Sequence, residues 1–210
     1  MALNLEEQEQ VAELKAWWTR YGSLLLMALV AAALAIGGVQ GWRLYQRNQA
    51  AQASVLYEAL SKAAEGGDAK VVREAGGALA EGYPRTLYAS LGALVAARYY
   101  FDHNDLKNAR AQLQWVLEHS VSDDLRDLAR LRLAAVLLDD KALDEALRLL
   151  DEKHGDAYAG QYAALKGDVL VAKKLIAEAK TAYRGALEKS GKADGAFRDS
   201  VRMRLDALGG

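Results

Sequence analysis

The first hydrophobic pattern in the chain is an apolar segment near its start. Residues 21–42 carry no charged side chain and lie between Arg20 and Arg43. As a helix rising about 1.5 Å per residue, the segment is about 33 Å long, and the hydrocarbon core of a bilayer is about 30 Å thick. Aromatic side chains suited to membrane interfaces flank both ends, namely Trp17, Trp18, Trp42 and Tyr45. The pattern predicts a transmembrane helix over 21–42 that follows a tail over 1–20.

A cleaved signal peptide is the main alternative for this segment. Ala33-Leu34-Ala35 offers a small-x-small cleavage pattern. A signal peptide begins with a short, positively charged region, whereas this tail is 20 residues long and carries four glutamates. The transmembrane reading is therefore favoured. Charge does not fix the orientation, because Lys15 and Arg20 on one side balance Arg43 and Arg47 on the other.

Small residues recur within the apolar segment at intervals of four, at Ala33, Gly37 and Gly41. Such a face lets the backbone of a second helix approach closely. Glycine is also common in membrane helices in general, so the spacing alone leaves the contact open. We expect these three residues to form a helix-packing face.

The pattern after the apolar segment is helical throughout. Alanine, leucine, glutamate, lysine and arginine dominate, and Pro84 is the single proline. Nothing interrupts residues 43–65, so we expect the membrane helix to continue as an extension and to end at Gly66-Gly67.

Three segments beyond this extension share a repeated pattern. Each has a small residue in a first helix, a polar turn, and an alanine twelve residues after the small residue. These packing positions are Ala97 and Ala109, Ala134 and Ala146, and Gly167 and Ala179. The turn at Lys173-Lys174 is the weakest of the three. A poorer unit precedes them, with Val72 in place of the alanine.

The repeated pattern resembles the tetratricopeptide repeat, whose period is about 34 residues. The usual tryptophan and proline of that repeat are missing from these units. We therefore predict an all-α fold, in which a single transmembrane helix precedes an α-solenoid of degenerate tetratricopeptide-like hairpins. The repeat domain is expected over 66–210, with a capping helix that begins near Phe197.

Composition points away from catalysis and from nucleic acid. The chain has 27 basic and 28 acidic residues, so it lacks the basic excess of nucleic-acid binders. It has no cysteine, and its histidines (His103, His119 and His154) lack metal-ligand spacing. We expect no enzyme activity, no metal and no cofactor.

A binding surface is the remaining candidate site. Stacked hairpins form a concave face from their first helices. The repeat pattern predicts four side chains on this face: Arg98, Phe101, Leu138 and Val171. Ordinary packing between repeats explains the same residues equally well. The groove is thus an expectation that the sequence leaves open.

The order of features along the whole chain resembles one family. The tail "LEEQEQVAELKAWWTRYG" precedes the apolar segment, "GWR" ends it, and "AAQASVLYEAL" follows. The repeats contain "AQLQWVL" and "LRLAAVLLDDKALDEALRLLD". Together these segments are similar to the YfgM family, the ancillary subunits of the bacterial Sec translocon.

The resemblance implies a location and partners that the residues alone do not give. It implies a single-pass protein of the bacterial inner membrane, with the tail 1–20 in the cytoplasm and the repeats in the periplasm. It implies association with the SecYEG channel and with the periplasmic chaperone PpiD, and help in handing over translocating polypeptides. The alternative is an envelope scaffold for another process, such as division or outer-membrane assembly.

Overall fold

The chain folds into helices that form two compact units. The computed structural model describes residues 5–191 and 194–209, with side chains from residue 10 onward, and every regular element in this range is helical. One unit ends at Asn48 and the other begins at Gln49. The expected tail 1–20 and repeat domain 66–210 each include positions outside the described residues, at 1–4 and at 192, 193 and 210. The predicted all-α class is confirmed.

Helix α1 (Leu5–Gly66) is 62 residues long and contributes to both units. Its first part is apolar and exposed, and it is the one helix among the described residues that is long and apolar enough to cross a membrane. The four aromatic residues expected at the interfaces are also exposed: Trp17, Trp18, Trp42 and Tyr45. A surface this apolar needs apolar surroundings, as a bilayer provides.

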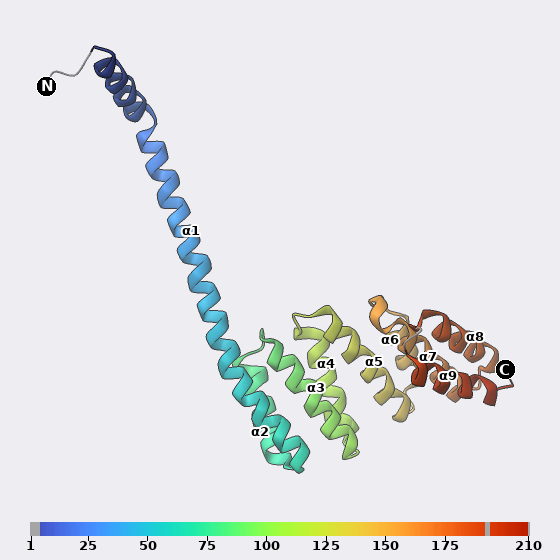
Figure 1. Cartoon of the computed structure of the whole chain (residues 1–210). Helices are drawn as coiled ribbons and strands as arrows, with labels where there is room; N and C mark the ends of the chain where they lie inside the picture. The colour runs from blue at the N-terminus through green and yellow to red at the C-terminus, as the bar shows by residue number, and fades with distance from the viewer. Residues whose placement is uncertain (1–4, 192–193, 210) are drawn as a thin grey trace. The chain divides into compact units, whose positions relative to one another are not determined.

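Helical hairpins make up the second unit (Figure 1). The end of α1 pairs with α2 (Ala69–Gly82), and α3 (Leu87–Asp102) pairs with α4 (Leu106–His119). Next, α5 (Asp123–Asp139) pairs with α6 (Leu143–Asp151). A short 3-10 turn, η1 (Asp156–Tyr158), leads to the pair α7 (Ala159–Ala172) and α8 (Ile176–Lys189), and α9 (Gly195–Ala207) packs on α8.

The same turn closes each hairpin. Its central residue has positive φ: Gly67 (76°), Asn104 (59°), Lys141 (62°) and Lys174 (63°). The amide of the next residue donates to the carbonyl oxygen five positions earlier, as in Asp105 N–Tyr100 O at 2.8 Å and Leu175 N–Leu170 O at 2.9 Å. This is the hydrogen-bond pattern of a Schellman motif, which ends a helix and satisfies its last carbonyl groups. The turns recur with the spacing of the small residues, so the hairpin is the structural repeat.

All six small residues expected at the packing positions are buried. Ala109, Ala134, Ala146 and Ala179 are fully buried, and Ala97 is 3% exposed. Gly167 on α7 lies directly under the ring of Tyr183 on α8, because a Cβ built on Gly167 would come within 2.6 Å of Tyr183 Cδ1. Paired helices approach this closely only where one of them lacks bulk.

Helix α9 closes the far end of the second unit. Val201 on α9 is fully buried in a cluster with Ala179 and Tyr183 of α8. Arg204 on α9 donates to Asp168 on α7 at 2.7 Å, and the Tyr183 hydroxyl donates to the same carboxylate at 2.8 Å. Burial and this carboxylate raise the pKa of Tyr183, so it stays a neutral donor. A polar-faced terminal helix of this kind shields the last repeat from water.

Replacing Lys174 with glycine is expected to stabilise the repeat unit. Lys174 is exposed and holds a left-handed backbone conformation that costs a residue with a Cβ about 1 kcal/mol. Lys174→Gly should therefore raise the Tm of the full chain in detergent micelles by about 2–4 °C, as followed by circular dichroism. Lys174→Ala keeps the Cβ and should give no gain. An equal rise in both variants would show that the lysine side chain, not the backbone, is unfavourable there.

The same substitution at two glycines is expected to have opposite effects. Gly167→Ala forces a methyl group against Tyr183 and should lower the free energy of unfolding by about 1–3 kcal/mol. Gly185→Ala on α8 meets nothing within 4 Å and should raise it by up to about 1 kcal/mol, through better helix propensity. Urea unfolding of both variants measures the difference. A Gly167→Ala chain as stable as wild type would mean that Tyr183 moves aside without cost.

Candidate protein-binding groove

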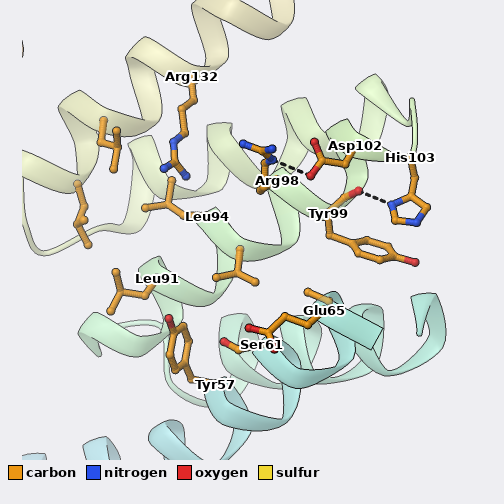
Figure 2. A pocket seen from close by; sticks show the side chains of 14 residues that line it. Tyr57, Ser61, Glu65, Leu91, Leu94, Arg98, Tyr99, Asp102, His103 and Arg132 are labelled. Atoms are coloured by element: carbon orange, nitrogen blue, oxygen red, sulfur yellow. Dashed lines mark hydrogen bonds and ion pairs between the residues drawn. The ribbon is translucent and has the colours of Figure 1, made fainter. Parts of the chain in front are cut away.

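A groove lies along the first helices of three successive hairpins. It has a cavity of about 780 Å³, lined by the end of α1, by α3 and by α5. We call this cavity the inner groove. Figure 2 shows Tyr57, Ser61 and Glu65 on the α1 side, Leu91, Leu94 and Arg98 on α3, and Arg132 on α5. Because first helices form the concave face of such solenoids, the inner groove lies where repeat proteins bind other polypeptides.

The floor of the inner groove is apolar. Leu94 is 4% exposed, and Leu91, Leu125 and Leu128 are half-buried. A smaller cavity of about 240 Å³ adjoins it between α3 and α5, and shares Arg98 and Arg132 with it. The two cavities together offer apolar surface with a few charged groups at fixed places, as binding sites usually do.

The two arginines of the groove differ in their partners. Arg98 donates to Asp102, one turn along α3, at 2.6 Å. Arg132 makes no hydrogen bond or ion pair with any residue in the described part of the chain. Burial, followed by the nearby charge of Arg98, lowers the pKa of the Arg132 guanidinium, although arginine remains charged at neutral pH. The groove thus holds one cation without an acidic partner.

Other polar groups complete the rim. The Ser61 hydroxyl on α1 is buried and has no hydrogen-bond partner among the described residues. Glu65 lies one turn further along α1, and His103 follows α3 with its Nδ1 2.8 Å from the Tyr99 carbonyl oxygen. Negative charge therefore lies on the α1 side and at the end of α3, whereas the unpaired positive charge lies on α5 (Figure 2).

Of the four residues expected in the groove, Arg98 lines the inner groove and Phe101 lines the smaller cavity beside it. Arg98 lines the smaller cavity as well. Leu138 and Val171 line neither cavity and are half-buried against two different core clusters. They occupy the repeat position of Phe101. Leu138 lies on α5 beyond the last residue of that helix that lines a cavity, and Val171 lies on α7, which lines neither cavity. At these two positions the side chains pack against the repeat core.

Arg132, Ser61 and Leu128 are groove residues that the sequence analysis missed. The spacing of the repeat could have identified two of them, Ser61 and Leu128. Ser61 and Arg98 occupy equivalent positions, each directly after a packing residue of its helix. Leu91 and Leu128 likewise occupy equivalent positions on α3 and α5. Residues at these spacings share one face of a helix. The repeat spacing does not identify Arg132, because the equivalent residue on α3 is Val95 and the charge is therefore not repeated.

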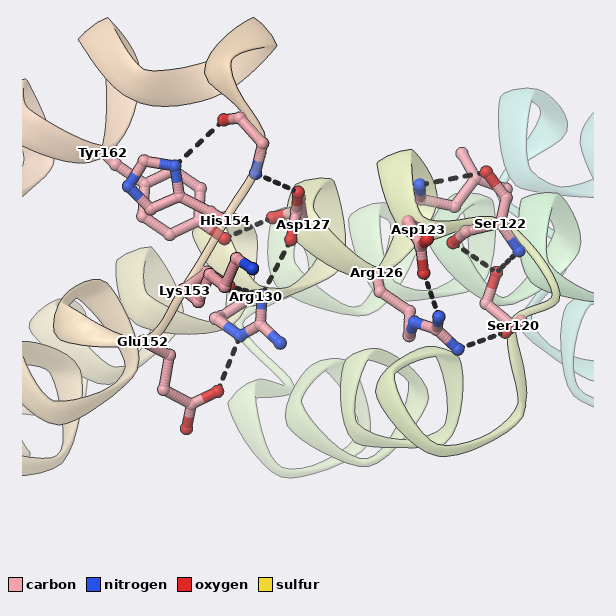
Figure 3. Close-up of polar contacts among 12 residues, drawn as sticks. Ser120, Ser122, Asp123, Arg126, Asp127, Arg130, Glu152, Lys153, His154 and Tyr162 are labelled. Carbon is pink, nitrogen blue, oxygen red and sulfur yellow. Dashed lines mark hydrogen bonds and ion pairs between the residues drawn. The ribbon is translucent and has the colours of Figure 1, made fainter.

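A polar network anchors α5 on another side of the helix (Figure 3). Asp127 is 8% exposed and accepts hydrogen bonds from Gly155 N and from Arg130, both at 2.8 Å. The Tyr162 hydroxyl on α7 donates to the Asp127 carbonyl oxygen at 2.8 Å. Arg130 also pairs with Glu152 at 2.9 Å. These contacts tie α5 to the next repeat, so the helix that carries Arg132 is held firmly.

Each of the three histidines packs against an aromatic ring. His119 stacks on Trp115 with ring centroids 4.7 Å apart, and His154 stacks on Tyr162 at 4.0 Å. Across residues 5–191 and 194–209, no group of three or more potential metal-ligating side chains is found. Each histidine instead packs locally at or just beyond a helix end.

Comparison with known proteins identifies relatives along the whole chain. Residues 15–210 match the model of a tetratricopeptide repeat-like domain. An ancillary SecYEG translocon subunit from Neisseria gonorrhoeae is 34% identical, over 99% of this chain and 100% of its own. Proteins with the same name from Haemophilus influenzae and Escherichia coli are each 29% identical, over 99% of this chain. No solved structure matches the chain.

The match agrees with the arrangement of the molecule. The relatives are covered over 99–100% of their length, so the similarity extends over both the apolar helix and the repeats of this chain. The family resemblance seen in the sequence is thereby confirmed. This chain belongs to the tetratricopeptide repeat-like family that includes the ancillary SecYEG translocon subunits.

Proposed function

We propose that this chain is a non-enzymatic, membrane-anchored adaptor of the Sec translocon. The observation that carries the proposal is the 34% identity to an ancillary SecYEG translocon subunit over essentially the whole of both chains. A helix fit to cross a membrane and a repeat unit with an open groove support it, because an adaptor needs an anchor and a binding surface.

The adaptor holds its parts on two sides of the inner membrane. The tail 1–20 lies in the cytoplasm, 21–42 spans the bilayer, and the repeats lie in the periplasm. There the groove meets the chaperone PpiD or a polypeptide leaving the channel, and the protein assists the handover. The family resemblance supports this orientation, and large domains cross the membrane largely regardless of the charge near the span.

The small-residue face of the span is the proposed contact with the channel. A Cβ built on Gly37 or Gly41 meets nothing within 4 Å. Larger side chains at these positions therefore leave the chain's own structure undisturbed and act only on a neighbouring helix. Close approach of backbones is what drives association between helices in lipid.

Filling this face is expected to detach the protein from the channel. The double variant Gly37→Leu, Gly41→Leu should lower the SecYEG and PpiD that co-purify in mild detergent by about tenfold, the effect of losing about 1.4 kcal/mol of contact. Ala32→Leu with Ala35→Leu is the matched control. Successive residues of an α-helix are rotated by about 100°, so these two lie on the side of α1 opposite Gly37 and Gly41. The control should co-purify like wild type.

Two outcomes would contradict this proposal. Equal co-purification by both double variants would remove the small-residue face from the contact. Failure of the wild-type chain to co-purify with any channel component would remove the translocon role and favour the envelope scaffold.

The orientation can be tested with single cysteines, because the chain has none of its own. Val121→Cys, at a position 62% exposed in the repeat unit, should react with a membrane-impermeant maleimide in intact spheroplasts. Glu13→Cys, in the tail, should react only after the membrane is opened. The reverse pattern would place the repeats in the cytoplasm and exclude a periplasmic handover.

A further inference from the structure

We propose that the inner groove binds a partner's polypeptide segment in which a carboxylate side chain lies between apolar side chains, and that Arg132 holds the carboxylate. The inference rests on the proposed adaptor function and names the chemistry of its binding site. It follows from the unpaired charge on α5, from the distribution of acids around the groove, and from the apolar floor.

The first argument is the environment of Arg132. Its guanidinium has no acidic partner in the described part of the chain, and both the surrounding protein and Arg98 act against its positive charge. Arg132 is exposed where it lines the inner groove, so a partner can reach it, and a carboxylate can accept two parallel hydrogen bonds from its guanidinium fork. Arg98 is already paired with Asp102, so Arg132 is the groove cation that remains for a partner's carboxylate.

The second argument is that the chain's own acids do not fill this role. Asp102 is engaged by Arg98, and Glu65 lies on the α1 side of the groove, away from Arg132 (Figure 2). An acidic side chain of the partner is repelled near Glu65 and attracted near Arg132. The charges thus fix which end of the groove receives the carboxylate.

The third argument is the surface between these charges. Leu91, Leu94 and Leu128 provide apolar contact, and the cavity of about 780 Å³ has room for several side chains. Because the groove runs across three inner helices, an extended or helical polypeptide fits it better than a compact molecule does.

The test uses the full chain in lipid nanodiscs and a display library of short random peptides. Peptides are selected on the wild-type chain and counter-selected on the Arg132→Leu chain. Glutamate or aspartate flanked by apolar residues is expected to be enriched. One enriched peptide is then compared with its acid-to-amide version by fluorescence anisotropy.

The acid-to-amide change in the peptide and the Arg132→Leu substitution in the chain should remove the same interaction. The wild-type chain is expected to bind the acidic peptide about tenfold more tightly than the amide version, as for one charge-assisted hydrogen-bonded pair. Arg132→Leu should bind both peptides with the same low affinity. Arg73→Leu, an exposed arginine on α2 outside the groove, is the matched control and should bind like wild type.

Several results would overturn the inference. These are a library without enrichment, enriched peptides without acids, or equal affinity of wild type and Arg132→Leu for the acidic peptide. A second copy of this chain in the groove would exclude peptides, and would appear as an oligomer that Arg132→Leu dissociates. Arg132→Leu should still co-purify with SecYEG through the span, so a failed peptide test with channel association intact refutes the inference and leaves the adaptor function standing.

Discussion

The second unit depends on the burial of the end of α1. Ala53 and Leu60 are fully buried there against Val72 and Leu79 of α2. A repeat cannot bury its apolar face alone, so the solenoid begins inside the same helix that carries the candidate span. The α1 side of the inner groove also comes from this helix. Anchor and binding surface therefore share one element, and a fragment starting after Gly66 would lack a wall of the groove.

Much of this fold is predictable because the hairpin turn imposes strict spacing. The small residues, the positive-φ residues and the second-helix alanines keep fixed offsets in each unit, and such offsets are visible in the sequence. The Lys173-Lys174 turn looked weak because lysine does not favour a left-handed conformation. Its backbone hydrogen bonds nevertheless match those of the Asn104 turn. The compact unit begins at Gln49, within the expected extension 43–65. Its first hairpin is harder to see in the sequence, because Leu60 and Val72 stand where the next repeat has alanines.

The groove was less predictable than the fold. Periodicity gives the face of a helix but not how far a cavity extends along it, which depends on how successive hairpins pack. Phe101 and Leu138 are periodic equivalents, yet only Phe101 lines a cavity. Arg132 breaks the repeat, since the equivalent residue on α3 is Val95. A residue that differs from its equivalents in the other repeats is not found by aligning the repeats. Such a residue is also what gives one repeat a binding preference that the others lack.

Two arginines on α5 show how a structural charge differs from one available to a partner. Arg130 is held by Asp127 and Glu152, and its side chain is 16% exposed. The pairing offsets the cost of removing a charge from water, and the network ties α5 to the next repeat. Arg132, two residues later, has no such partner and lies beside another arginine. Because Arg132 is exposed to solvent, its guanidinium is available to a carboxylate of a binding partner.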